Sequence, residues 1–91
     1  TVNVKAGSTD DSIKKFIEQT LKEYNKDAFE KITFKDVQKA IKITSLNSSV
    51  AKVSSDYVIT GVTAGKTVKA KIQATDGKIT EEVSFILINV N

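Results

Sequence analysis

A change in hydrophobic rhythm near residue 42 is the feature that most constrains how this chain can fold. Before it, apolar residues recur every three or four positions, as on one face of a helix; after it, they alternate with polar residues, as in strands. Neither half alone has enough apolar surface for a core. We therefore predict one α+β domain over residues 1–91, with a helical segment at about 8–41 and a β segment at about 42–91.

The main helix is predicted over residues 10–24, after a short alternating strand that ends at Gly7. Residues 8–10 are candidate N-caps, and Asn25 is the expected stop because Asn tolerates the left-handed conformation common at helix C-termini. One face of this helix is apolar and carries Ile13, Phe16, Ile17, Leu21 and Tyr24.

A second, shorter helix is predicted over residues 34–41. Thr33 is its expected N-cap, and Asp36 stands three residues later, as in a capping box. Ile41 could equally begin the first strand of the β segment, and the pattern does not decide between the two.

The β segment predicts an antiparallel sheet of four to five strands, with the helical segment packed on it. Asp76-Gly77 is the clearest turn signal, since this dipeptide favours the tight turn of a hairpin. The predicted strands cover residues 42–46, 50–54, 57–62, 66–75 and 78–90.

The last predicted strand carries apolar residues on both faces. One face holds Val83, Phe85 and Leu87, and the other holds Ile86, Ile88 and Val90. We expect both faces to be covered, one of them by the helix face led by Phe16. Internal burial is favoured, because a complete core needs nearly all the apolar residues. The alternative is contact with another copy, for which Ile86, Ile88 and Val90 would form the assembly face.

The composition excludes several classes of enzyme, because the chain has neither His nor Cys. A His-based general base, a thiolate nucleophile and the usual zinc and haem sites all need one of them. Gly61–Thr67 has three residues between its glycines where a phosphate-binding loop has four, and strand alternation follows it. We expect no catalytic residues, no metal site and no cofactor, and we interpret Gly61–Thr67 as a turn between strands.

Paired carboxylates occur at Asp10-Asp11 and at Glu81-Glu82. Helix capping explains the first pair, and neighbours in a strand, as Glu81 and Glu82 would be, point to opposite faces. Neither pair is therefore expected to share a proton or a metal ion.

The net charge of +3 comes from 14 basic residues, all lysine, against 11 acidic ones. Lysines without arginine or stacking aromatics make nucleic acid an unexpected partner. No apolar run reaches the roughly 18 residues of a transmembrane segment. A face of the C-terminal hairpin with Lys66, Lys69, Lys71 and Lys78 is the candidate site for an anionic partner. The alternative is a solvated strand face whose lysines discourage edge pairing.

Residues 45–65, SLNSSVAKVSSDYVITGVTAG, resemble the signature of group 2 bacterial immunoglobulin-like domains. In that family a Ser/Asn turn leads to a Val-Ala-x-Val strand and then to a Val/Ile-Thr-Gly-Val-x-x-Gly segment. The resemblance implies an immunoglobulin-like C-terminal part. The overall layout is also similar to mollicute surface lipoproteins such as the spiralins.

Both resemblances imply a non-enzymatic module of a bacterial cell-surface protein or lipoprotein, used for adhesion, spacing or host contact. The expected location is extracellular or at the cell surface, and the expected partner is another protein or a host surface component. The alternative function is a self-assembling structural subunit, such as a coat or filament protein of a bacterium or phage.

Overall fold

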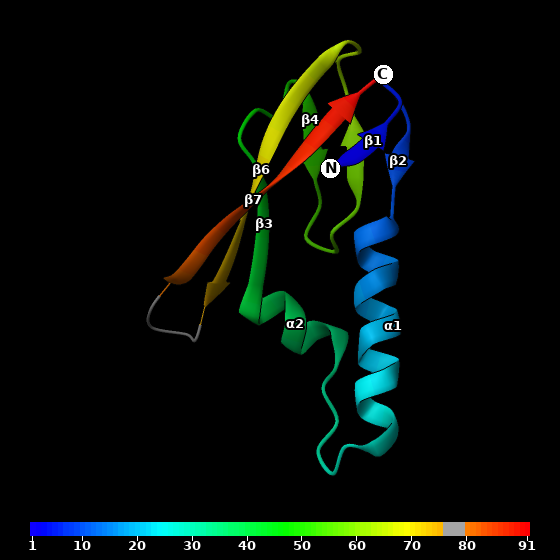
Figure 1. The fold of residues 1–91 in the computed structure, drawn as a ribbon, viewed down its shortest axis with the longest axis vertical. Helices are drawn as coiled ribbons and strands as arrows, with labels where there is room; N and C mark the ends of the chain where they lie inside the picture. Colours follow the sequence, from blue (N-terminus) through cyan, green and yellow to red (C-terminus); the bar gives the residue numbers. More distant parts are fainter. Residues whose placement is uncertain (76–79) are drawn as a thin grey trace.

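The computed structural model describes the backbone of residues 1–75 and 80–91 and the side chains of residues 1–74 and 84–91. The described residues form two sheets, with two helices between the second and third strands (Figure 1). The first sheet has the order β1 (Val2–Val4), β7 (Thr80–Val90), β6 (Lys66–Thr75) and β3 (Ile41–Ser45). The second has the order β2 (Thr9–Asp10), β5 (Ile59–Gly61) and β4 (Ala51–Val53). The helices are α1 (Ser12–Asp27) and α2 (Phe34–Ala40).

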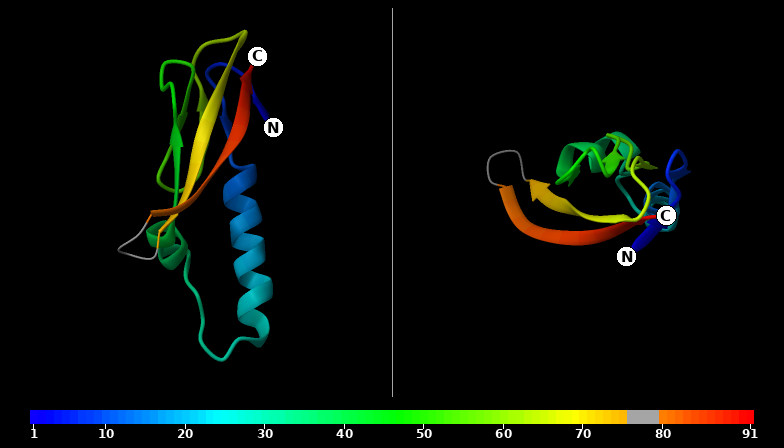
Figure 2. Two further views of the ribbon diagram at one scale, coloured as in Figure 1. Left: turned by 60° about the vertical axis from the view of Figure 1, so that its left-hand side comes forward. Right: turned by 90° about the horizontal axis from the view of Figure 1, so that it is seen from above.

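The two sheets face each other and enclose the core (Figure 2). The α+β class is confirmed, but the single antiparallel sheet is wrong, because the strands divide between two layers. Each layer is apolar on its inner face and needs the other to cover it. The buried cluster consists of Val4, Val50, Ala51, Ile59, Val68, Ala70, Ile88 and Val90.

The strand β1 gives the first sheet a mixed character, since it pairs with β7 in parallel while the other pairs are antiparallel. Val2 is paired with Ile88 and Val4 with Val90. The backbone amide of Asn91 also donates to the carbonyl of Val4 at 2.9 Å. The two ends of the chain are therefore bound side by side.

Gly61 lies where the chain after β1 crosses the end of β5. A Cβ atom at this position would approach the Lys5 carbonyl oxygen to 2.5 Å. The Gly61 amide donates to the Ser8 carbonyl at 2.9 Å, and the Gly61 carbonyl accepts from the Gly7 amide at 2.8 Å. Glycine is required here because two backbones are in direct contact.

The strand β7 is covered on one face only, so the expectation that both faces would be covered is wrong. Ile88 and Val90 are buried between the sheets, whereas Phe85 and Leu87 on the opposite face are exposed. Phe16, which was expected to lead the covering helix face, is itself exposed to solvent. No described element lies over the outer face of β7 to cover it.

The main helix exists as predicted, but it runs from Ser12 to Asp27 instead of over residues 10–24. The Asp10 carboxylate accepts the amide of Ser12 at 3.0 Å, so the helix begins after the acidic pair. Asn25 does not stop the helix. Its side chain accepts the Ile32 amide at 2.8 Å and donates to the Ile32 carbonyl at 2.7 Å, which fastens the following loop to the helix.

The second helix has the predicted capping box. The Thr33 hydroxyl accepts the Asp36 amide at 3.2 Å, and the Asp36 carboxylate accepts the Thr33 amide at 2.8 Å. The helix ends at Ala40, and Ile41 begins β3, which decides the alternative left open by the sequence. Where they are described, the remaining predicted strands match the observed ones to within about two residues, as is usual for element boundaries. The predicted turn at Asp76-Gly77 and the first two residues of the last predicted strand lie outside the described residues.

The helical segment projects from one end of the sandwich instead of packing on a sheet face, as Figures 1 and 2 show. No residue of α1 is buried. Both helices contact the loop between β4 and β5: Lys14 of α1 pairs with Asp56 at 3.5 Å, and Gln38 of α2 donates to the Ser55 carbonyl at 2.8 Å. The molecule is consequently elongated, measuring 46 × 27 × 17 Å.

Candidate binding surface

The outward surface of the strands β3, β6 and β7 combines lysines with exposed apolar side chains. Cross-strand pairing places Lys71 between Thr44 and Phe85. The next row places Lys69 beside Leu87, and on its other side the Leu46 amide donates to the Lys69 carbonyl at 3.0 Å. We call this surface the outer face; its residues are Lys42, Thr44, Leu46, Lys69, Lys71, Phe85 and Leu87.

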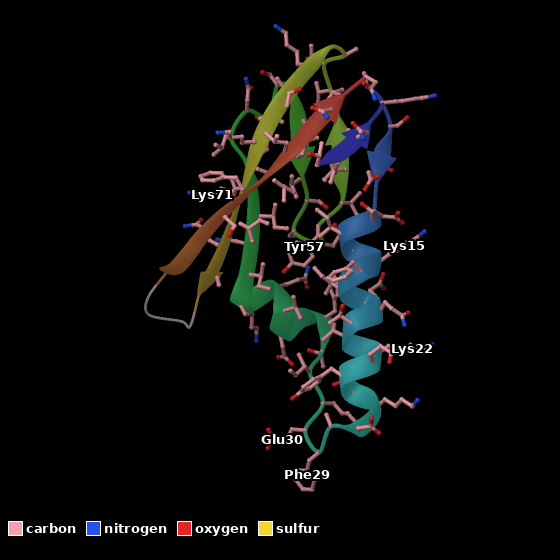
Figure 3. All side chains as sticks on the ribbon, viewed as in Figure 1. Lys15, Lys22, Phe29, Glu30, Tyr57 and Lys71 are labelled. Atoms are coloured by element: carbon pink, nitrogen blue, oxygen red, sulfur yellow. The ribbon has the colours of Figure 1, made fainter. Side chains whose placement is uncertain are left out.

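The apolar side chains of the outer face are open to solvent. Leu46 is 54% exposed, Phe85 53% and Leu87 42%. The Lys69 ammonium lies 5.8 Å from the centre of the Phe85 ring, a distance at which a cation is attracted to the aromatic face. Lys71 projects from the sheet on the side away from α1 (Figure 3). The outer face therefore offers positive charge and apolar area together.

The charged residues named for the outer face are all positive. Lys42, Lys69 and Lys71 occupy outward positions on β3 and β6. At the outward strand positions whose side chains the structure describes, there is no Asp or Glu to neutralise them. Such a surface attracts anionic groups, and the attraction weakens as salt rises.

A polar ladder borders the outer face at the end nearest the chain termini. The Thr67 hydroxyl donates to the Asn89 side-chain oxygen at 2.7 Å. The Asn89 amide nitrogen donates in turn to the Asn3 side-chain oxygen at 3.2 Å. This ladder crosses three adjacent strands and gives the outer face a hydrophilic boundary.

The predicted lysine cluster is only partly assembled. Lys69 and Lys71 lie together on the outer face. Lys66, at the first position of β6, pairs with Val90 and belongs to the opposite face of the strand. Lys78 lies outside the described residues. Residues at even and odd positions of a strand point to opposite faces, so the sequence numbers of Lys66 and Lys69 already separate these two lysines.

The residues of the alternative assembly face lie inside the domain. Ile88 and Val90 are buried in the core, and Ile86 packs against it. Contact between copies through this strand would have to use Phe85 and Leu87. The sequence shows these two residues as apolar but not as neighbours of the lysines. A predicted hairpin does not by itself fix the register that pairs Lys71 with Phe85 and Lys69 with Leu87.

The acidic pair Asp10-Asp11 and the glycine-containing loop are structural, but the expected helix N-cap is corrected: it is Asp11 instead of one of residues 8–10, and its side chain makes no capping hydrogen bond. Asp10 accepts hydrogen bonds from Ser12 at the start of α1, and Asp11 pairs with Lys15 at 3.6 Å. The side chains of Glu81 and Glu82 lie outside the described part. Residues 62–65 form a turn from β5 into β6, which confirms the interpretation of this segment as a connection between strands.

Tyr57 anchors the helical segment to the sandwich. Its side chain is buried, and its hydroxyl lies 2.8 Å from the Ile41 carbonyl oxygen and 3.1 Å from that of Val37. The Phe34 ring meets the Tyr57 ring edge-on at a centroid distance of 5.7 Å. Burial raises the pKa of the Tyr57 hydroxyl. These contacts are structural, because the hydroxyl is occupied by backbone acceptors.

Asp56, next to Tyr57, is held in its ionised form. The Ser54 hydroxyl donates to its carboxylate, and this hydrogen bond is the largest cause of its lowered pKa; Lys14 adds a smaller contribution. The Asp56 carboxylate therefore binds Ser54 in its own loop and Lys14 on α1. In the described ranges no cluster of acidic side chains is arranged to hold a metal ion.

No protein-family model, curated protein or solved structure matches the chain. Across the part of the chain that is described, no helix combines the length and apolarity needed to cross a membrane.

Proposed function

We propose that this chain is a non-enzymatic, immunoglobulin-like module of a bacterial surface protein or lipoprotein, which binds another protein or a host surface component through the outer face. The observation that carries the proposal is the combination on the outer face of Lys69 and Lys71 with exposed Phe85 and Leu87. Exposed apolar residues rimmed by polar ones are typical of protein-binding surfaces.

The strand order supports an immunoglobulin-like architecture. In immunoglobulin constant domains one sheet holds strands A, B, E and D and the other holds C, F and G. If β2 to β7 are taken as strands B to G, the two sheets contain B-E-D and C-F-G, with β1 as strand A beside G. On this assignment α1 and α2 form an insertion between strands B and C. The family resemblance of residues 45–65 points the same way.

The chemistry of the outer face selects an acidic partner with apolar side chains of its own. Lysines with no carboxylate beside them among the described side chains favour approach of a negative surface and increase the association rate. The exposed rings and aliphatic side chains then supply the area that loses water on binding. A partner with only negative charge would leave Phe85 and Leu87 unused.

Binding to synthetic peptides tests this proposal. Glutamate-rich peptides that carry apolar residues at alternating positions should bind, and polyglutamate should bind more weakly. The double variant Lys69→Glu/Lys71→Glu should lose binding, and Phe85→Ser should weaken it. The matched control is Lys15→Glu/Lys22→Glu, which makes the same charge change on α1, away from the outer face (Figure 3).

The results separate a specific surface from a general effect of charge. If both double variants lose binding equally, net charge alone accounts for the interaction and the outer face has no special role. If wild-type protein binds neither kind of peptide, the proposed partner chemistry is wrong. Surface display is tested separately, because protease added to intact source cells should remove the module while cytoplasmic proteins survive.

A further inference from the structure

We propose that the helical segment is a dimerisation surface, on which a second copy of this chain packs its own helical segment about a two-fold axis. This inference is independent of the outer face and of its partner. It rests on the apolar face of α1, the groove between α1 and α2, and the loop that joins them.

The apolar face of α1 is a helix face without a complete partner. A helix of 16 residues normally buries its apolar stripe, yet α1 buries no residue. Phe16 is 70% exposed and Tyr24 53% exposed. Thr20 lies between them on the same face, and its hydroxyl is turned onto the Phe16 carbonyl at 2.8 Å. A small side chain at this position leaves room for close approach by another helix.

The groove between the helices continues this face. One part has a volume of about 230 Å³ and is lined by Phe16, Ile17, Thr20, Leu21, Val37 and Ile41. A second part, of about 550 Å³, extends toward the loop and shares Val37 and Ile41 with the first. Its lining includes Tyr24 and Ile32. The groove is therefore long enough to accept several side chains of a partner.

Phe29 is the side chain best placed to enter such a groove. It is 101% exposed and lies at the tip of the loop, at the end of the molecule far from both termini (Figure 3). Two helical segments packed side by side in opposite directions bring the loop of each copy toward the groove of the other. A two-fold axis makes this exchange reciprocal and closes the assembly at two copies.

The exposed apolar area is sufficient for a dimer. With about 200 Å² for each aromatic side chain, Phe16, Tyr24 and Phe29 together expose on the order of 450 Å². A standard interface buries about 800 Å² per partner, of which roughly 60% is apolar. The two values agree, so these side chains could supply the apolar centre of such an interface.

The charges around the groove favour a second copy over a strongly charged partner. Lys26 and Lys31 flank Phe29 together with Asp27 and Glu30, so the tip has no net charge. A surface on which positive and negative charges are interspersed can match an identical surface turned about a two-fold axis. Such a surface also lacks the excess of lysines that would attract anionic lipid. The outer face, whose described charged side chains are all lysines, differs in this respect.

Sedimentation velocity over a wide range of protein concentrations tests the proposal. Wild-type protein should shift from monomer to dimer as concentration rises. Phe16→Ser and Phe29→Ser should each weaken dimerisation by about tenfold or more, as expected for aromatic anchors at an interface centre. Phe85→Ser, which removes an exposed aromatic ring from the outer face, is the matched control and should leave dimerisation unchanged. Circular dichroism checks that every variant is folded.

Cysteine variants give a second, local measurement, because the natural chain has no cysteine. For Phe29 to reach the groove of the partner, the two-fold axis has to lie near Tyr24. Tyr24→Cys should therefore form a disulfide-linked dimer on mild oxidation, whereas Glu18→Cys, on the opposite side of α1, should not. A wild-type protein that stays monomeric at every concentration overturns the proposal. So does a dimer that Phe16→Ser and Phe29→Ser leave intact, or a monomer whose helical segment binds neutral lipid vesicles instead.

Discussion

The hydroxyl of Tyr57 donates to the carbonyl oxygen of Ile41 across 2.8 Å, and this contact ties the loop between β4 and β5 to the first residue of β3. The Val37 carbonyl lies 3.1 Å from the same hydroxyl. Tyr57 adopts a left-handed backbone with φ 68°, which is unfavourable for a residue with a side chain. The surrounding contacts hold it in that conformation, and Tyr57 thereby adds a buried link to the Lys14–Asp56 and Gln38–Ser55 contacts between helices and sandwich.

Tyr57→Phe should lower the free energy of unfolding by about 1 kcal/mol, the usual net value of one intramolecular hydrogen bond. The substitution keeps the ring and its edge contact with Phe34 and removes only the hydroxyl. Urea unfolding measures the loss. Tyr24→Phe, at an exposed tyrosine, serves as control and should change stability by less than about 0.5 kcal/mol. Equal effects of the two substitutions would contradict the anchoring role.

Alkaline pH should destabilise the protein through the same residue. Burial raises the pKa of Tyr57 in the folded state, so folding favours the protonated hydroxyl. This contribution to stability is complete below the unfolded pKa of about 10 and is lost as pH rises through the folded value. Unfolding measured over this range should show a steeper decline for wild type than for Tyr57→Phe. Parallel curves would show that other groups, such as lysines, account for the decline.

Thr33→Ala should destabilise the protein by about 1 kcal/mol, as is typical for loss of an N-cap side chain. The lowered pKa of Asp36 provides a second measurement, because the Thr33 amide is its largest cause and the Thr33 hydroxyl the next. Since the folded pKa is depressed, stabilisation by the Asp36 carboxylate is present above its unfolded pKa and lost as pH falls through the folded one. NMR titration should find the Asp36 pKa nearer its ordinary value in Thr33→Ala. An unchanged pKa would argue against the hydroxyl contribution.

Adjacent residues on β7 should respond in opposite ways to the same substitution. Ile88→Lys should destabilise the domain by about 3 kcal/mol or more, since it buries a charge without a partner. Leu87→Lys should change stability by only about 0.5 kcal/mol, because Leu87 is on the exposed outer face. Chemical unfolding of both variants measures the difference. Similar losses would mean that the outer face of β7 is covered in solution.

Features set by nearby residues were predictable from the sequence, and features set by distant residues were not. Thr33 and Asp36 form their capping box as predicted because both partners lie within one turn. The end of α1 was missed because the Asn25 side chain bonds Ile32, seven positions away. The division into two sheets depends on long-range pairs such as Val4 with Val90.

In the candidate site, too, the features set by nearby residues were predictable and those set by strand pairing were not. Lys69 and Lys71 were identified from alternation alone, which places them on one side of a strand. Leu46 became part of the outer face only through the pairing of β3 with β6, and Phe85 and Leu87 through the pairing of β6 with β7. The apolar side chains of the site were thus visible in the sequence as hydrophobic residues but not as a surface.

The parallel pairing of β1 with β7 also determines how the domain resists mechanical tension. The N-terminus leads into the start of β1, and the C-terminus follows the end of β7. Because the two strands are parallel, a force that pulls the termini apart pulls β1 and β7 in opposite directions along their length. The hydrogen bonds between them are then loaded together in shear instead of opening one after another. A pulling experiment with single molecules should therefore find that separation of β1 from β7 sets the rupture force.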